Sequence, residues 1–170
     1  MPVKIIILYL AYHNAMLLST HPVEYRYNKF NAWFAVISLA AIIGVAVPYI
    51  ISNAKAGDNG IALAILTVAG IAALMLVFVV NKYFIPALRG DIALEINVKG
   101  ITSHLHNLSV SWRDVENIEV KGGRTADVLY IYFKQETDYG DYVRIPLQWI
   151  TGNDDDIYET AKAFWKHKPQ

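Results

Sequence analysis

The residues of this chain that could do chemistry are few, and two histidines come first. His104 and His106 are two positions apart in a segment that alternates like a strand, so both are expected on one face, as metal ligands require. A zinc site uses at least three protein ligands, and the sequence offers no third nearby. We therefore interpret both as exposed histidines on a polar strand face, and we predict no metal site.

Three consecutive aspartates, Asp154 to Asp156, are the second candidate for a metal site. They stand at the start of a segment with helical periodicity, where carboxylates are favoured by the helix dipole. The triplet is thus most simply a helix start. The chain has no cysteine, and it shows no glycine-rich phosphate loop or nucleophile motif. We predict a protein that is not an enzyme, with no catalytic residues and no cofactor.

Binding is the remaining chemistry, and two groups of residues are candidates for it. Lys121 and Arg124 flank two glycines and are expected on a loop, where cations can contact an anionic lipid head group. Glu119 and Asp127 weaken that field, and such contacts usually take about four to eight basic residues, so a solvated turn ranks first. An exposed aromatic patch for a protein partner is the other candidate, although core burial explains at least half of its members: Tyr130, Tyr132, Tyr139, Tyr142 and Trp149.

Two uncharged apolar stretches dominate the first half of the chain. Hydrophobic residues make up 55% and charged residues 18% of the sequence, whereas a soluble domain usually carries about a quarter charged residues. Residues 30–52 and 61–80 are each long enough to cross a hydrocarbon layer of about 30 Å. The turn-forming segment 53–60 joins them. We predict a two-helix transmembrane hairpin over residues 30–85.

Basic residues around the hairpin predict its orientation. Arg26 and Lys29 precede the first span and two basic residues follow the second, whereas the connecting loop carries only Lys55. The positive-inside rule then places both termini in the cytoplasm, at the inner membrane of the cell. Neither span contains an ionisable side chain, so proton or ion pathways lose their usual residues. The residues expected at the membrane interface are Trp33, Lys82, Tyr83 and Arg89.

The first 29 residues allow two interpretations. Lys4 followed by the apolar run 5–18 resembles a signal peptide, but no small-residue cleavage site follows, and the run is too short to span. It is therefore expected at the membrane interface or against the soluble domain. Val23 to Tyr27 is rich in strand formers and could add a strand to the C-terminal sheet.

Residues 86–170 predict a soluble α+β domain. Period-two alternation indicates strands at 92–98, 101–105 and 142–147, and the apolar segment 128–133 is expected at the centre of the sheet. Apolar residues at helical spacing then indicate a helix that packs on the sheet: Ile157, Ala161, Phe164 and Trp165. This part is mildly acidic, which argues against nucleic acid as a partner.

The segment Ser111 to Val115, which leads into Ile118, is similar to the Trp-acidic-aliphatic strand start of a known family. With the hairpin and the C-terminal helix, it resembles bacterial pleckstrin-homology-like (PH-like) domain proteins with two transmembrane helices. The resemblance implies a half-open antiparallel β-barrel capped by a C-terminal helix, used for binding proteins or lipids. We therefore expect a membrane-anchored module that binds a protein partner and that could form a homo-oligomer. The alternatives are an immunity protein against a membrane-targeting toxin and a sensor of anionic lipid head groups.

Overall fold

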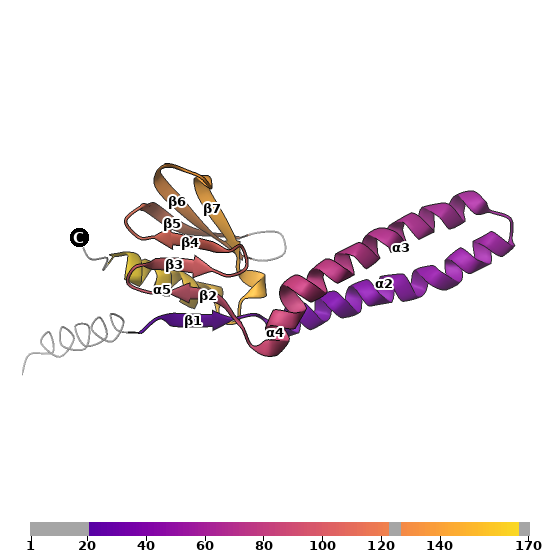
Figure 1. The fold of residues 1–170 in the computed structure, drawn as a ribbon, viewed down its shortest axis with the longest axis horizontal. Coiled ribbons are helices and arrows are strands. Elements are labelled where there is room, and N and C mark those ends of the chain that lie inside the picture. Colours follow the sequence, from indigo (N-terminus) through magenta and orange to yellow (C-terminus); the bar gives the residue numbers. More distant parts are fainter. Residues whose placement is uncertain (1–20, 123–126, 167–170) are drawn as a thin grey trace, which may run out of the picture. The chain divides into compact units, whose positions relative to one another are not determined.

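The computed structural model describes residues 21–122 and 127–166 (Figure 1). The predictions for residues 1–20 and for Arg124 lie outside this part of the chain. Two compact units divide the chain, one made of residues 27–91 and the other of the flanking residues up to Arg26 and from Ile92 onward. Each unit is described by itself below.

The helical unit is an antiparallel hairpin of two long helices, α2 (Lys29–Lys55) and α3 (Asn59–Val79). Each helix begins with a side-chain cap: the side-chain oxygen of Asn28 accepts from the Asn31 N–H at 3.1 Å, and a carboxylate oxygen of Asp58 accepts from the Ile61 N–H at 3.3 Å. Such caps satisfy N–H groups that have no partner inside the helix. A π-helical turn, η1 (Val80–Phe84), and the short helix α4 (Ile85–Arg89) follow α3.

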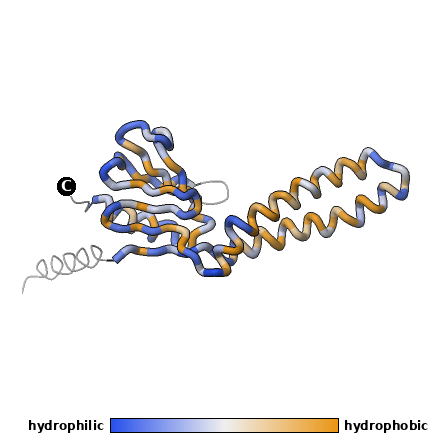
Figure 2. The backbone as a smooth tube through the Cα atoms, in the orientation of Figure 1, coloured by the Kyte–Doolittle hydropathy of each residue, from blue (hydrophilic) through white to orange (hydrophobic). Residues whose placement is uncertain are grey.

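Small residues make the contact between the two helices, and large apolar residues cover their outer surfaces. The buried positions are all alanines: Ala32, Ala46, Ala62, Ala69 and Ala72. Phe34 and Leu74, by contrast, are 65% and 75% exposed. The hydrophobic colour runs along nearly the whole length of both helices (Figure 2). Among the described residues, these two helices are long and apolar enough to cross a membrane, judged by length and composition.

The other unit begins with a strand that precedes the hairpin in the chain. The strands β1 (Val23–Arg26), β2 (Ile92–Ile96), β3 (Gly100–Ser103) and β4 (Leu108–Ser111) form an antiparallel sheet in that order. In the register of β1 and β2, Tyr25 pairs with Leu94 and Arg26 with Ile92. The extra strand expected at residues 23–27 is therefore present as β1.

A second antiparallel sheet consists of β5 (Val115–Gly122), β6 (Asp127–Thr137) and β7 (Gly140–Pro146), with β6 in the centre as predicted. Leu129, Ile131 and Ile145 are fully buried on its inner face. Burying each such side chain contributes roughly 1.5–3 kcal/mol. A 3-10 turn, η2 (Leu147–Trp149), follows β7.

Trp112 lies where the chain passes from the first sheet to the second. Only 1% of its surface is exposed, and its indole N–H donates to the carbonyl oxygen of Asn97 at 2.7 Å. Its main-chain N–H donates to the carbonyl oxygen of Lys99 at 3.1 Å. Both bonds attach this passage to the turn between β2 and β3. The tryptophan of the family-like motif thus joins the two sheets and is not exposed.

The C-terminal helix α5 (Asp154–Lys166) packs on the sheets through Ile157, Ala161 and Phe164, which are all buried. The side chain of Asn153 accepts from the Asp155 N–H at 3.2 Å, so the acidic triplet forms the first turn of the helix, as predicted. The complete layout is therefore α+β: two long apolar helices near the N-terminus, then antiparallel sheets and a C-terminal helix.

Two strand predictions are wrong at their ends. The segment 92–98 was expected to be extended, but β2 ends at Ile96. The segment 101–105 was expected to be extended throughout, but β3 ends at Ser103 and His104 to Asn107 form the turn to β4. Asn107 has a left-handed φ of 51°, a conformation that asparagine adopts more readily than most residues. Burial still alternates through the turn, where Leu105 is buried between the exposed His104 and His106, so the alternation alone did not show where the strand ends.

Candidate interaction surface

The three-stranded sheet presents a row of tyrosines on its outer side. Leu129 and Ile131 of β6 point into the core, so the alternating residues Tyr130 and Tyr132 point outward. Tyr142 of β7 pairs with Tyr132 across the strands and is 43% exposed. We call this surface the tyrosine face and define it by the outward residues of the three strands: Asn117, Glu119, Lys121, Tyr130, Tyr132, Tyr142 and Arg144.

The three tyrosine rings contact one another. The centroids of Tyr130 and Tyr132 are 6.3 Å apart with an angle of 18° between the ring planes. Tyr142 lies 5.9 Å from Tyr130 and 5.8 Å from Tyr132, with tilted rings. Aromatic pairs at such distances contribute about 0.5–1.5 kcal/mol beyond their buried area. The rings therefore form an ordered cluster on this side of the sheet.

Lys121 lies over this cluster. Its Nζ atom is 5.1 Å from the ring centre of Tyr130 and 5.2 Å from that of Tyr132, distances typical of cation–π contacts. The same ammonium donates to the phenol oxygen of Tyr132 at 2.6 Å and pairs with Glu119 at 3.0 Å. The bond to Tyr132 raises the pKa of Lys121, and the bond from Lys121 lowers the pKa of Glu119. Lys121 is thus a cation with its counter-charge already in place.

Arg144 is the second cation of the tyrosine face. It follows Tyr142 by two residues on β7, and its guanidinium carbon lies 6.0 Å from the Tyr142 ring centre. Its register partner on β6 is Tyr130. Within the described residues, the Arg144 guanidinium has no ion pair or hydrogen bond. Its donors are therefore available to a binding partner.

The structure brings together four of the five residues predicted as a partner or lipid contact: Lys121, Tyr130, Tyr132 and Tyr142. The fifth, Arg124, lies outside the described residues. Lys121 was expected on a loop, but it belongs to β5, because that strand continues to Gly122, which pairs with Asp127. Of the other candidate aromatics, Tyr139 lies in the β6–β7 turn and Trp149 in η2.

Asn117, Glu119 and Arg144 complete the surface, and sequence reasoning selected none of them as a site residue. The signal for Arg144 was present, because alternation along β7 puts it on the same face as Tyr142. Nothing in the sequence showed that Glu119 would pair with Lys121 while Arg144 forms no ion pair within the described part of the chain.

The residues predicted at the membrane interface gather at the end of the hairpin that holds both of its chain ends. Trp33 of α2 contacts Phe84 edge to face, with ring centres 4.7 Å apart. Lys82 lies 5.5 Å from the ring centre of Phe78 and 5.7 Å from that of Tyr83. Arg89 is the last residue of α4. Trp, Tyr and Lys are the residues enriched where a helix leaves the hydrocarbon layer.

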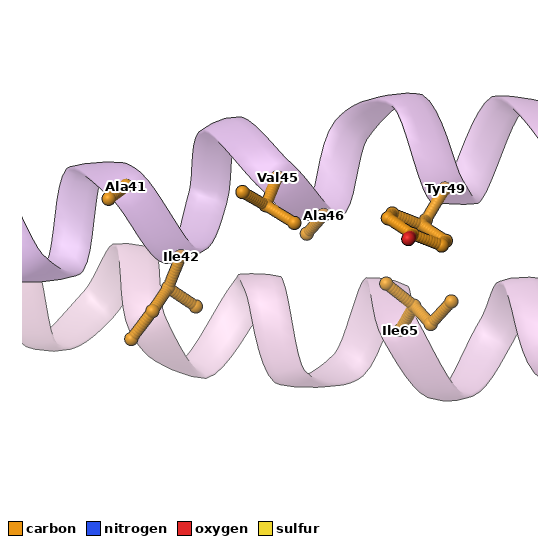
Figure 3. A pocket seen from close by; sticks show the side chains of 6 residues that line it. All are labelled: Ala41, Ile42, Val45, Ala46, Tyr49 and Ile65. Carbon is orange, nitrogen blue, oxygen red and sulfur yellow. The ribbon is translucent and has the colours of Figure 1, made fainter.

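A shallow hollow lies beside α2, further along the hairpin (Figure 3). It is lined by Ala41, Ile42, Val45, Ala46, Tyr49 and Ile65. Apart from the phenol of Tyr49, the lining side chains are hydrocarbon. Such a lining can accept apolar groups.

The two histidine and aspartate candidates do not combine into a metal site. His104 and His106 lie in the β3–β4 turn, so the expectation of a shared strand face is wrong. In the residues that the structure describes, no group of three or more His, Asp or Glu is arranged to hold a metal ion. Burial raises the pKa of Asp154, and the charges of Asp127 and Asp155 raise it further.

Comparison with known proteins gives no relative: no family model matches the chain, and no curated protein or solved structure matches it either.

The tyrosine face can bind by ring stacking and by charge-assisted hydrogen bonds, which are the strong kind at protein surfaces. Its exposed aromatic and arginine side chains are of the types that most often dominate binding energies at protein interfaces.

Proposed function

We propose that this protein is a membrane-anchored, non-catalytic interaction module. Its hairpin α2–α3 crosses the inner membrane. The unit made of β1 to β7 and α5, which we call the β-domain, binds a protein partner through the tyrosine face. The observation that carries the proposal is that face: three tyrosine rings in mutual contact and a guanidinium that has no ion pair among the described residues, all on the outer side of one sheet. Exposed clusters of Tyr and Arg are typical of interaction sites.

The surface chemistry of the hairpin supports insertion into lipid. Large apolar side chains are exposed on both helices, which is costly in water and favourable in hydrocarbon. Polar side chains inside or beside the apolar stretches bond to their own helix: Thr67 donates to the Leu63 carbonyl at 2.9 Å, and Asn81 to the Val77 carbonyl at 2.8 Å. Backbone and side-chain donors so satisfied suit a medium without water.

The pairing of β1 with β2 supports an even number of crossings. β1 precedes the hairpin and β2 follows it, yet Arg26 and Ile92 are register partners in one sheet. This pairing supports a placement of both ends of the hairpin on one side of the membrane. The basic residues near those ends, Lys29 and Arg89 among them, favour the cytoplasmic side.

The order of the strands and the helix in the β-domain supports the PH-like fold. A four-stranded and a three-stranded antiparallel sheet are followed by one amphipathic helix, which is the element order expected of a half-open barrel capped at its end. In this interpretation the hairpin is an insertion between the first and second strands.

Photo-crosslinking in the native membrane tests the function. Tyr142 of the full-length protein is replaced by p-benzoylphenylalanine, and Tyr158 on α5 is replaced likewise as a matched control. We expect a discrete protein adduct from position 142 and none of the same mass from position 158. The adduct is expected to decrease when Tyr130→Ser is added, with thermal unfolding checked to exclude loss of the fold. Adducts with lipid alone, or none at all, would contradict partner binding through this face.

A further inference from the structure

The two cations of the tyrosine face differ in their ion pairing. Lys121 forms an ion pair with Glu119, whose carboxylate oxygen is 3.0 Å from Nζ. Arg144, in the described part of the chain, has aromatic contact but no carboxylate within ion-pair distance. The positive charge that this surface offers to a partner is therefore concentrated at one side chain.

The position of Arg144 prepares it for a planar anion. Contact of the guanidinium with the Tyr142 ring restricts the rotamers of the side chain without using any N–H donor. A guanidinium has five such donors in a fixed fork, and two of them match the two oxygens of a carboxylate. Because part of the rotamer entropy has already been lost, less is lost when the carboxylate binds.

We infer that the segment bound by the tyrosine face is acidic: a Glu or Asp carboxylate of the partner protein pairs with Arg144, and a neighbouring apolar or aromatic residue packs on Tyr130 and Tyr142. This inference rests on the proposed function and specifies the chemistry of the partner. The positions that would bind the carboxylate and the apolar residue lie close together, since Arg144 and Tyr130 are register partners on adjacent strands.

A protein carboxylate fits this surface better than a lipid bilayer. Attraction to anionic lipid usually takes about four to eight basic residues, whereas Glu119 pairs with Lys121 and leaves Arg144 as the cation without a counter-charge. The aromatic rings beside it, which a head group does not need, are suited to an apolar or aromatic side chain of a protein. A positively charged ligand is disfavoured, because the Lys121 ammonium lies close to the rings of Tyr130 and Tyr132 and would repel a second cation.

Selection from a random peptide library tests the inference. The bait is the full-length protein in phosphatidylcholine nanodiscs, and the probes are the selected peptides, resynthesised. We expect Asp or Glu beside an aromatic or large apolar residue in peptides whose binding requires Tyr142. Loss of a charge-assisted hydrogen bond predicts that Arg144→Gln weakens their binding about 10-fold or more. Arg113→Gln changes an exposed arginine outside the tyrosine face and is expected to leave binding unchanged.

Two further variants guard against misfolding as the cause. Arg144→Lys keeps the charge but loses the fork, so an intermediate affinity is expected. Arg144→Glu is expected to select basic peptides in place of acidic ones, a change that an unfolded bait cannot produce.

The alternative outcomes are distinct. Tyr142-dependent peptides without acidic residues, bound equally by Arg144→Gln, would overturn the inference and leave the proposed function standing. Absence of any Tyr142-dependent peptide would contradict the proposed function and the inference together. Capture of phosphatidylglycerol vesicles by the wild type but not by Arg144→Gln would assign the guanidinium to lipid and also overturn the inference.

Discussion

The phenol oxygen of Tyr25 lies 3.0 Å from Oγ1 of Thr160, although 135 positions separate the two residues in the chain. This bond ties β1 to α5. A second link is close by, because Thr151 donates its main-chain N–H to the carbonyl oxygen of Arg26 at 2.8 Å. The strand before the hairpin is thereby held to the end of the protein as well as to β2.

Tyr25→Phe tests the first link. The substitution removes the hydroxyl and keeps the ring, so we expect the free energy of unfolding of the β-domain to fall by about 1 kcal/mol. Thermal unfolding in detergent measures the loss. Tyr139→Phe at the exposed β6–β7 turn is the control and is expected to have no effect. Equal stabilities for both variants would show that the Tyr25–Thr160 bond does not stabilise the domain.

Gly100 tests the close approach of β3 and β4. A Cβ atom at this position would overlap the main-chain carbonyl oxygen of Val110, so Gly100→Ala forces the strands apart. We expect a destabilisation of about 1–3 kcal/mol, as for other overpacked sites. At Gly122 an added Cβ would meet its nearest atom, a carboxylate oxygen of Asp127, at 3.6 Å, an ordinary contact. Gly122→Ala is therefore the control, and chemical denaturation of both variants measures the difference.

The pH dependence of Glu119 tests the ion pair of the tyrosine face. The bond from Lys121 lowers the pKa of Glu119 below its ordinary value of 4.5. A lowered pKa in the folded state stabilises the protein above the unfolded value, and this contribution disappears as the pH falls through the folded value. Lys121→Met is expected to raise the carboxyl pKa, measured by NMR titration of Glu119. An unchanged titration midpoint would mean that the pair does not persist in solution.

Cysteine labelling tests the orientation of the hairpin, and the chain has no native cysteine to interfere. In intact spheroplasts, a membrane-impermeant thiol reagent is expected to label Asp58→Cys in the α2–α3 connection. Asp138→Cys in the β6–β7 turn should react only after the membrane is permeabilised. The reverse pattern would place the β-domain outside the cell, and equal labelling in intact cells would argue against a spanning hairpin.

Replacing the hairpin by a short turn tests whether β1 belongs to the β-domain. The main-chain N–H of Tyr27 donates to the carbonyl oxygen of Asp91 at 3.3 Å, so the two ends are close enough for a tight connection. With residues 28–90 exchanged for Asn-Gly, a turn suited to antiparallel strands, we expect a soluble, folded domain. Residues 92–170 alone should be less stable, because β2 loses its neighbour. Equal denaturation midpoints would contradict this role of β1.

Much of the fold could be predicted from periodicity, but pairings between distant segments could not. The alternation along β6 correctly separated the buried Leu129 and Ile131 from the outward Tyr130 and Tyr132, because a strand has only two faces. Residue types at 23–27 predicted an added strand but not its partner, since the pairing of β1 with β2 spans the whole hairpin. Lys121 was misplaced because two glycines after it indicate a turn, whereas its strand extends to Gly122.

The candidate surface was also predicted only in part, because the sequence indicates which residues share a face but not which of them are in contact. Residue types indicated an aromatic patch, and strand alternation indicates which residues share a face. Whether a cation is ion-paired depends on which carboxylates lie close to it in the folded protein. The pairing of Lys121 with Glu119, and the absence of an ion pair at Arg144 among the residues that the structure describes, therefore required three-dimensional coordinates.

The place of the hairpin between β1 and β2 has a consequence for biosynthesis. A ribosome completes β1 first, then two apolar helices, and only afterwards the strand that will pair with β1. If the helices enter the bilayer as proposed, the first sheet can close only when both have crossed and their ends have returned to one side. A molecule whose insertion stops after one helix leaves β2 with an open edge, a state that aggregates readily and that proteases can recognise. Pairing of β1 with β2 would thus depend on correct insertion of both helices into the membrane.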